Sequence, residues 1–291
     1  MRYTTLIDAP ALRALAGDSH VAIVDCRFDL ARPEAGREAF LAGHIPAASH
    51  ADLGRDLSGP IGPATGRHPL PDPQEFAARL GSWGVDNDSQ VIAYDAGNGA
   101  FAARLWWMLR WLGHRQAAVL DGGLDAWTGA GGTLQAGDGA PAARRFVAHA
   151  DADAWVSTAQ VVRGLAQRAY LLVDARAPER YAGAVEPLDS VAGHVPGAVN
   201  HPFGANLGPG GHFLDAEQLR RRWLARLDAR APAEVVAMCG SGVTACQNLL
   251  ALEVAGLHGA RLYAGSWSEW IRDPARPVAR GGEPSDSRNY S

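Results

Sequence analysis

Cysteine and long apolar runs are both scarce in this chain of 291 residues. Its 3 cysteines are too few for a disulfide framework, and none stands near a histidine at metal-ligand spacing. No apolar run approaches the roughly 20 residues that cross a bilayer, and the N-terminus lacks the basic and apolar parts of a secretory signal. These absences predict a cytoplasmic protein with no membrane contact, no structural zinc and no disulfide.

An excess of basic residues is missing as well. The formal net charge is −4, so the sequence predicts no surface for nucleic acid. Hydrophobic residues make up 47% of the chain and charged residues 20%, which is typical of a globular protein. This length predicts two domains of about 100–150 residues, each with its own core.

Four short motifs occur twice, in the same order and at nearly one offset. The pairs are Val24–Arg27 with Val173–Arg176, Ala42–Pro46 with Ala192–Pro196, Val91–Asp95 with Val235–Cys239, and Leu120–Trp127 with Tyr263–Trp270. Two copies of this length indicate a duplicated domain rather than a solenoid. We therefore expect an N-terminal domain over 1–136, a linker over 137–154, a C-terminal domain over 155–280 and a tail over 281–291.

Short apolar runs alternate with segments of helical spacing in both halves. We predict strands over Val21–Asp25, Val91–Tyr94, Ala118–Leu120, Leu171–Asp174, Val235–Met238 and Ala260–Tyr263. We predict helices over Gln74–Trp83, Arg104–Leu112, Thr158–Ala166, Ala216–Leu227 and Thr244–Ala255, with Asp215 as an N-cap and Gln218 three residues on. Such alternation predicts an α/β fold in which each half is a parallel sheet with helices on both faces.

The chemistry is expected where the strand Val235–Met238 ends. Cys239 follows it directly, and ligands of open α/β sheets bind beyond the carboxyl ends of the strands. Gly240 and Gly242 let successive amide N–H groups converge on an anion at the start of the next helix. That field favours the thiolate of Cys239 at neutral pH and makes it a nucleophile without a partner histidine.

The alternative for any single cysteine is a buried apolar side chain. Cys239 lies between a strand and a glycine-rich turn, and this place favours a functional role over a buried structural one. For the other two cysteines we expect a structural role. Cys26 has Ala175 as its counterpart in the second half, and Cys246 lies inside a predicted helix.

The loop Cys239–Ala245 resembles the active-site loop of the 3-mercaptopyruvate sulfurtransferases, which belong to the rhodanese superfamily. Further stretches resemble the tandem-domain members, namely Arg104–Trp107, Leu120–Gly123, Asp174–Arg176, Gly193–Ala198 and Gly265–Trp270. The resemblance implies two tandem rhodanese-like domains and a sulfurtransferase that carries sulfur as a persulfide on Cys239. It also implies an inactive N-terminal domain, because Asp95 stands where that domain would need its cysteine. We expect Asp95 to cap its own turn.

The resemblance extends to the site. It implies that Ser241 is catalytic with Cys239, that Arg180 holds the donor's carboxylate, and that the substrate also meets Gly240, Gly242, Val243, Thr244 and His68. A guanidinium suits a carboxylate because it can bond both oxygens at once. Arg27, Arg176, His44 and His194 occur in both halves, the inactive one included, so we expect structural roles for them.

The chain departs from the family's pattern at two positions. Leu188 stands where the mercaptopyruvate enzymes have a second arginine, which puts carboxylate binding by two arginines in question. Gly54 stands where the family has an aspartate that forms a relay with the serine and the cysteine. Asp52 or Asp56 is the candidate substitute.

The residues of the Cys239 loop also indicate which sulfur donor is preferred. The thiosulfate-preferring relatives carry basic side chains after the cysteine, and Gly240–Gly242 has none, which favours 3-mercaptopyruvate. Cyanide, a thiol or a reduced thioredoxin-like protein is the expected acceptor, and we expect no cofactor. Three alternatives remain: thiosulfate as the preferred donor, a non-catalytic sulfur carrier or regulatory module, and a cysteine phosphatase. The phosphatase loop requires an arginine where this chain has Ala245.

Overall fold

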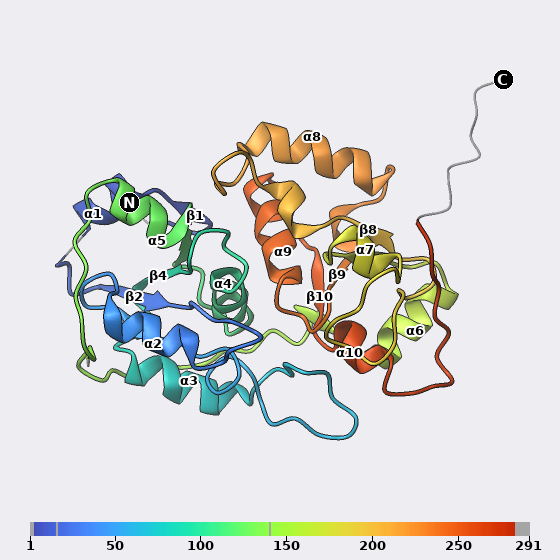
Figure 1. The fold of residues 1–291 in the computed structure, drawn as a ribbon, viewed down its shortest axis with the longest axis horizontal. Helices are drawn as coiled ribbons and strands as arrows, with labels where there is room; N and C mark the ends of the chain where they lie inside the picture. Colours follow the sequence, from blue (N-terminus) through green and yellow to red (C-terminus); the bar gives the residue numbers. More distant parts are fainter. Residues whose placement is uncertain (1–2, 16, 140, 283–291) are drawn as a thin grey trace.

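The computed structural model describes residues 3–15, 17–139 and 141–282, and within them two five-stranded parallel sheets stand side by side (Figure 1). The strand order is β1-β5-β4-β2-β3 in the first sheet and β6-β10-β9-β7-β8 in the second. The first comprises β1 (Leu6–Ile7), β2 (Val21–Asp25), β3 (Ser49–His50), β4 (Gln90–Tyr94) and β5 (Ala117–Leu120). The second comprises β6 (Trp155–Val156), β7 (Leu171–Asp174), β8 (Val199–Asn200), β9 (Val235–Met238) and β10 (Arg261–Tyr263). The topology of the first half is thus repeated strand for strand in the second.

Helices cover both faces of each sheet, in matching positions. One face of the first sheet packs against α1 (Ala9–Ala14), α2 (Ala35–Ala42) and α5 (Gly123–Gly129), and the other against α3 (Pro73–Ser82) and α4 (Ala102–Trp111). In the second sheet, α6 (Thr158–Ala166), α7 (Pro178–Tyr181) and α10 (Ser266–Trp270) cover one face, and α8 (Ala216–Leu227) and α9 (Ala245–Val254) the other. Two short 3₁₀ helices span Phe203–Asn206 and Pro232–Glu234. The predicted α/β fold with two sheets, each covered on both faces, is confirmed.

The predicted elements are confirmed to within two residues at each end. Thr158–Ala166 and Ala216–Leu227 are helices with the predicted bounds, and Asp215 caps α8 in a capping box with Gln218. Five short helices, α1, α2, α5, α7 and α10, were not predicted. Four strands were not predicted either: β1, β3, β6 and β8, which have two residues each and lie at the sheet edges. Two residues are too few to show a period. No helix in the described ranges is both long and apolar enough to span a bilayer.

The arginines that follow β2 and β7 have the same structural role in the two halves. Arg27 pairs with Asp25 at 2.6 Å, and Arg176 pairs with Asp174 at 2.6 Å. Each guanidinium also donates to a backbone carbonyl, at 2.8 Å in both halves. The repeated histidines are structural too. In each, Nδ1 donates to a backbone carbonyl at 2.8 Å, and the ring stacks on an aromatic ring: His44 on Phe40 and His194 on Tyr181.

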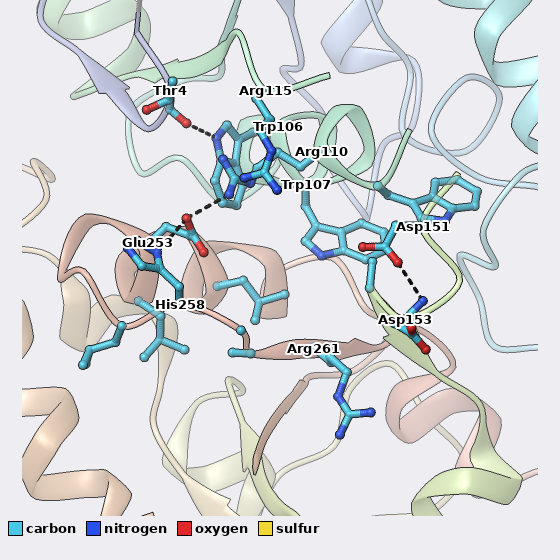
Figure 2. A pocket seen from close by; sticks show the side chains of 17 residues that line it. Thr4, Trp106, Trp107, Arg110, Arg115, Asp151, Asp153, Glu253, His258 and Arg261 are labelled. Carbon is cyan, nitrogen blue, oxygen red and sulfur yellow. Dashed lines mark hydrogen bonds and ion pairs between the residues drawn. The ribbon is translucent and has the colours of Figure 1, made fainter. Parts of the chain in front are cut away.

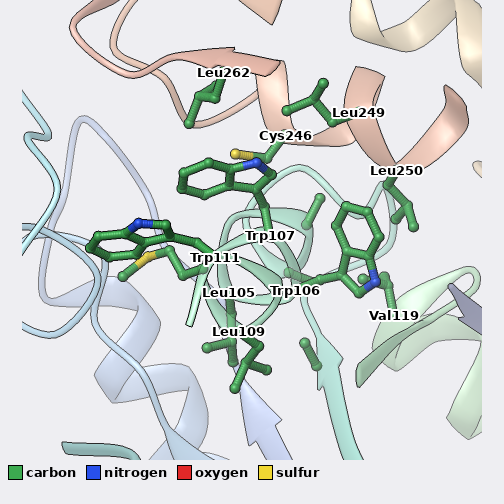
Figure 3. Packing of buried hydrophobic residues seen from close by; sticks show 14 of the residues in the cluster. Leu105, Trp106, Trp107, Leu109, Trp111, Val119, Cys246, Leu249, Leu250 and Leu262 are labelled. Carbon is green, nitrogen blue, oxygen red and sulfur yellow. The ribbon is translucent and has the colours of Figure 1, made fainter. Parts of the chain in front are cut away.

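The two halves meet where α4 packs against α9, and one apolar cluster runs through the contact (Figure 3). Every residue of α4 except Arg110 is buried, as expected for a helix that is covered all round. Trp107 of α4 points toward Leu249 and Leu262 of the second half, which belong to the same cluster (Figure 3). This contact holds the two sheets together and brings residues of the first half to the loop after β9.

A cavity of about 480 Å³ lies at the same boundary (Figure 2). Arg110 and Glu253 form an ion pair of 2.9 Å across it, and the Arg110 guanidinium lies 5.0 Å from the ring centre of Trp106. Its walls are formed mainly by α4, by the end of α9 and by the turn before β10. The loop that begins at Cys239 does not contribute to these walls.

Candidate active site

The loop that begins at Cys239 joins β9 to α9, and α10 holds it from one side. The Cys239 amide donates to Oγ of Ser266 at 3.1 Å, and the amides of Trp267 and Ser268 donate to the carbonyls of Cys239 and Gly240 at 3.0 and 2.9 Å. The side chain of Cys239 is buried, since the residue is only 2% exposed. These bonds fix the loop backbone at the carboxyl end of a central strand.

Glycine is required at position 242. Its φ of +77° lies in the left-handed region, and a Cβ there would come within 2.5 Å of the Ala264 carbonyl oxygen. The loop therefore bends in a way that a residue with a side chain would resist. The bend places Val243 and Thr244 immediately before α9.

The equivalent loop of the first half shows what this backbone can hold. Asp95 stands at the position of Cys239, after β4, and its carboxylate accepts four backbone N–H groups at 3.0–3.2 Å. The predicted cap of its own turn is confirmed. Burial raises the pKa of Asp95, and the four amides oppose that rise. In the first half, then, the strand–loop–helix unit is an anion nest built from the backbone.

His68 of the first half meets Ser241 of the Cys239 loop. Nδ1 of His68 lies 2.8 Å from Oγ of Ser241, and both side chains are buried. Burial, together with the positive charges of Arg104 and Arg67, lowers the pKa of His68 from 6.5 to about 3. A neutral imidazole with its proton on Nδ1 donates to Ser241 and leaves the serine hydroxyl hydrogen free for a charge that develops in the site.

Because His68 is buried in its neutral form, we expect the free energy of unfolding to fall as the pH is lowered. The folded chain binds a proton on His68 only near pH 3, whereas the unfolded chain binds it below about pH 6.5. Its contribution to stability is therefore present above pH 6.5 and is lost as the pH falls toward 3. On acidification from pH 6.5 to 4.5, His68→Asn should lose less unfolding free energy than the wild type, by on the order of 2 kcal/mol. Denaturant titrations at the two pH values measure this, and equal losses in both proteins would contradict it.

Arg104 lies behind the loop and was not predicted as a site residue. It is fully buried, and its guanidinium donates to the carbonyl oxygens of Gly242 at 3.1 Å, Leu57 at 3.3 Å and His68 at 3.2 Å. Among the residues that the structure describes, no carboxylate pairs with it and its Nε has no hydrogen-bond partner. Its charge acts instead on the thiols of Cys246 and Cys239. Arg104 and Arg110 are the two charged residues of an otherwise apolar helix. This pattern indicates that a cation is buried but does not show which loop it contacts.

Arg180 lies over the loop. It comes from α7, and both terminal nitrogens of its guanidinium are 3.5 Å from the point where a Cβ on Gly240 would stand. Its counter-ions are Glu186 at 2.6 Å and Asp189 at 3.3 Å. The structure thus brings Arg180, Ser241, His68 and Gly240 together at the Cys239 loop.

The two candidate aspartates of the relay have other partners. Asp56 pairs with Arg55 and with Arg79, each at 3.2 Å. Asp52 accepts the amide of Arg55 at 2.8 Å and so caps its own turn. The side chain that forms a hydrogen bond with Ser241 is instead that of His68. Leu188 is 44% exposed and, with His68, lines a cavity of about 580 Å³ beside the site.

The other two cysteines lie in the core, as expected. Burial raises the pKa of Cys246 to about 12 even though Arg104 is close by. Burial, with the nearby Asp25 and Asp95, raises the pKa of Cys26 well above its usual value. Both thiols are therefore held in the neutral form at physiological pH.

The fold and this loop define a class: an α/β protein of two duplicated domains, one of which presents a buried cysteine where the other holds a carboxylate in a backbone nest. The model of the rhodanese-like domain matches residues 8–130 and 157–273. The chain is 50% identical over 283 residues to a probable 3-mercaptopyruvate sulfurtransferase of Pseudomonas aeruginosa, covering 97% of this chain and 100% of the relative. It is 40% identical over 283 residues to a putative thiosulfate sulfurtransferase, SseB, of Mycobacterium tuberculosis, covering 96% and 98%.

A solved structure agrees with these relatives. The crystal structure of SseA from Escherichia coli, a 3-mercaptopyruvate sulfotransferase, matches with a TM-score of 0.79 and 32% identity over 91% of this chain and 100% of that one. The chain belongs to the rhodanese superfamily, as a member with two tandem rhodanese-like domains.

Proposed function

We propose that this chain is a sulfurtransferase that takes sulfur from 3-mercaptopyruvate as a persulfide on Cys239 and passes it to a thiophilic acceptor. The observation that carries the proposal is the duplicated loop. Where the first half holds the carboxylate of Asp95 with four amides, the second half has Cys239 at the same position. A nest that accommodates a buried carboxylate is suited to hold a thiolate or a persulfide anion.

The transfer proceeds in two displacements. In the first, the Cys239 thiolate attacks the donor's sulfur, an S–S bond forms, and the C–S bond breaks to release the enolate of pyruvate. In the second, an acceptor thiolate attacks the outer sulfur, a new S–S bond forms, and Cys239 leaves as the thiolate. The enolate takes a proton from water, and no oxidant or reductant enters either step.

Side chains around the loop supply the rest of the chemistry. Ser241, held by neutral His68, offers its hydroxyl hydrogen to the enolate oxygen as its negative charge develops. Arg180 binds the donor's carboxylate, while the amides of Gly240, Gly242, Val243 and Thr244 form the floor of the site. Arg104 adds a fixed positive charge beneath the nest, where the low dielectric strengthens it.

The two halves divide the work in this proposal. Residues 1–136 form a scaffold that contributes the wall with His68, and 155–280 carry the nucleophile, with 137–154 as the linker. The proposed tail, 281–291, lies outside the described residues from 283 on. A thiol, cyanide or a reduced thioredoxin-like protein accepts the sulfur in the cytoplasm.

A comparison of donors tests the proposal. We expect kcat/KM with 3-mercaptopyruvate to exceed that with thiosulfate, because the loop carries no basic side chain to neutralise a dianion. The measurement uses one acceptor for both donors, with multiple turnovers recorded. A higher kcat/KM with thiosulfate would overturn the donor assignment and leave the persulfide mechanism standing. A single turnover with either donor would indicate a sulfur carrier instead.

A further inference from the structure

The proposed function leaves the cavity of about 480 Å³ between the two halves without a role. Its size is in the range of small-molecule sites, which often lie at domain boundaries. Apolar side chains line it from both halves, namely Trp106, Trp107 and Trp111 from the first and Leu249, Leu252 and Leu257 from the second. A space between flat indole rings and aliphatic side chains is suited to the flat apolar body of a ligand.

One end of this cavity carries more positive than negative charge. Arg110 of the first half pairs with Glu253 of the second at 2.9 Å, and Nδ1 of His258 lies 3.1 Å from the same carboxylate. Arg115 also lines this end; it is exposed, and within the described part of the chain no carboxylate pairs with it. Two guanidinium groups and an imidazole thus gather around the single carboxylate of Glu253 (Figure 2).

The two arginines at this end repel each other. Burial lowers the pKa of Arg110, Glu253 opposes that change, and the positive charge of Arg115 lowers the pKa further. A second anion placed beside Arg115 would offset this repulsion, because an opposite charge stabilises the charged form of both guanidinium groups. This end of the cavity therefore favours a negatively charged group.

The other end of the cavity has the opposite preference. Asp151 and Asp153 lie near Trp107, away from the two arginines (Figure 2). The guanidinium of Arg261 does not offset them, since it lies 4.8 Å from the ring centre of Tyr170, which is outside the cavity wall. A ligand with a second negative charge at this end would be repelled. The cavity therefore fits one negative charge at one end of an uncharged body.

We propose that this cavity is a second binding site, and that its ligand is an aromatic carboxylate with a single negative charge. The carboxylate lies beside Arg115, and the rings lie between the indoles of α4 and the leucines of the second half. No residue of the Cys239 loop lines the cavity, so the site is separate from the one that binds the donor. Its ligand nevertheless contacts both helices that hold this loop, because Arg104 of α4 donates to the carbonyl of Gly242 and α9 follows the loop directly.

The probe is 2-naphthoate, which has one carboxylate on a flat uncharged body. Its binding to the full-length protein is measured by calorimetry, beside two control ligands. The first, 2-naphthamide, has no charge for Arg115 to bind. The second, naphthalene-2,6-dicarboxylate, brings a second carboxylate toward Asp151 and Asp153. We expect naphthoate to bind more tightly than either control.

Substitutions at the positive end should change naphthoate binding in opposite directions. Arg115→Gln should weaken it by roughly two- to fivefold, as expected for an exposed charge pair, and Arg115→Glu should weaken it more. Glu253→Gln should tighten it, because the competing carboxylate is then neutral. The matched control is Arg163→Gln on the exposed side of α6, which should leave binding unchanged.

The result expected is a preference for naphthoate that falls in the two Arg115 variants, rises in Glu253→Gln and stays the same in Arg163→Gln and Arg180→Ala. No binding, unchanged binding in Arg115→Glu, weaker binding in Glu253→Gln, or equal binding of the amide would overturn the proposal. A loss in Arg180→Ala would overturn it as well, because naphthoate would then bind at the Cys239 loop. None of these measurements uses sulfur transfer, so this site and the proposed function fail independently.

Discussion

Replacing Cys239 by serine is expected to abolish sulfur transfer from either donor. A hydroxyl at this position is not ionised at neutral pH and cannot form a persulfide, so no step of the proposed mechanism remains. The neighbouring thiols do not take over, because burial keeps Cys246 and Cys26 neutral. Steady-state assays with 3-mercaptopyruvate and with thiosulfate should both fall to the background rate.

The matched control is Cys26→Ala. Cys26 follows β2 as Ala175 follows β7, and alanine is already accommodated at that place in the second half. We expect this variant to keep full activity. Transfer that survives in Cys239→Ser, or transfer that is lost in Cys26→Ala while the protein stays folded, would contradict the assignment of the nucleophile.

Replacing Arg180 by alanine is expected to give the second largest loss. The guanidinium lies over Gly240 and is 18% exposed, so its pairing with a donor carboxylate takes place largely out of water. Truncating one partner of such a pair costs about 2–5 kcal/mol, which corresponds to roughly 30- to 4,000-fold in kcat/KM. Glu186 keeps Arg176 as a partner at 3.4 Å, so the fold should survive the change.

The kinetic constants for 3-mercaptopyruvate measure this effect, with Arg163→Ala on the exposed side of α6 as the control. The loss should be smaller for an uncharged thiol donor, because such a donor never used the guanidinium. Mercaptopyruvate turnover that is unchanged in Arg180→Ala would show that the carboxylate binds elsewhere.

The nucleophile could be predicted from the sequence because its environment is local. Cys239 follows a buried strand and precedes a glycine-rich turn that leads into α9, and all of this lies within about a dozen residues. The same reasoning predicted that Asp95 caps its turn, and four backbone bonds confirm it. The repeated arginines and histidines occur in both halves, the inactive one included. Their structural role could therefore be predicted from the sequence.

The residues that were missed depend on how the two halves dock. Arg104 and Arg67 lie more than a hundred positions from the loop in the chain, and no local pattern places them beside it. When the sequence is compared with the family position by position, Leu188 stands where the mercaptopyruvate enzymes have their second arginine. This indicated that the second arginine was absent. The docked structure brings a guanidinium to that region from the other domain, which no alignment along one segment would reveal.

The two-residue edge strands were missed for a different reason. β1, β3, β6 and β8 owe their conformation to pairing with a neighbouring strand and carry no period of their own. They lie at the margins of the sheets, and the site does not depend on them.

The mass of the Cys239 peptide tests the central claim most directly. The protein is incubated with 3-mercaptopyruvate and no acceptor, digested without reductant and analysed by mass spectrometry. We expect the peptide that contains Cys239 to gain about 32 Da, the mass of one sulfur atom, and to lose it when a thiol acceptor is added. The peptides of Cys26 and Cys246 should keep their masses. An unmodified Cys239 peptide from a protein that still transfers sulfur would contradict the account.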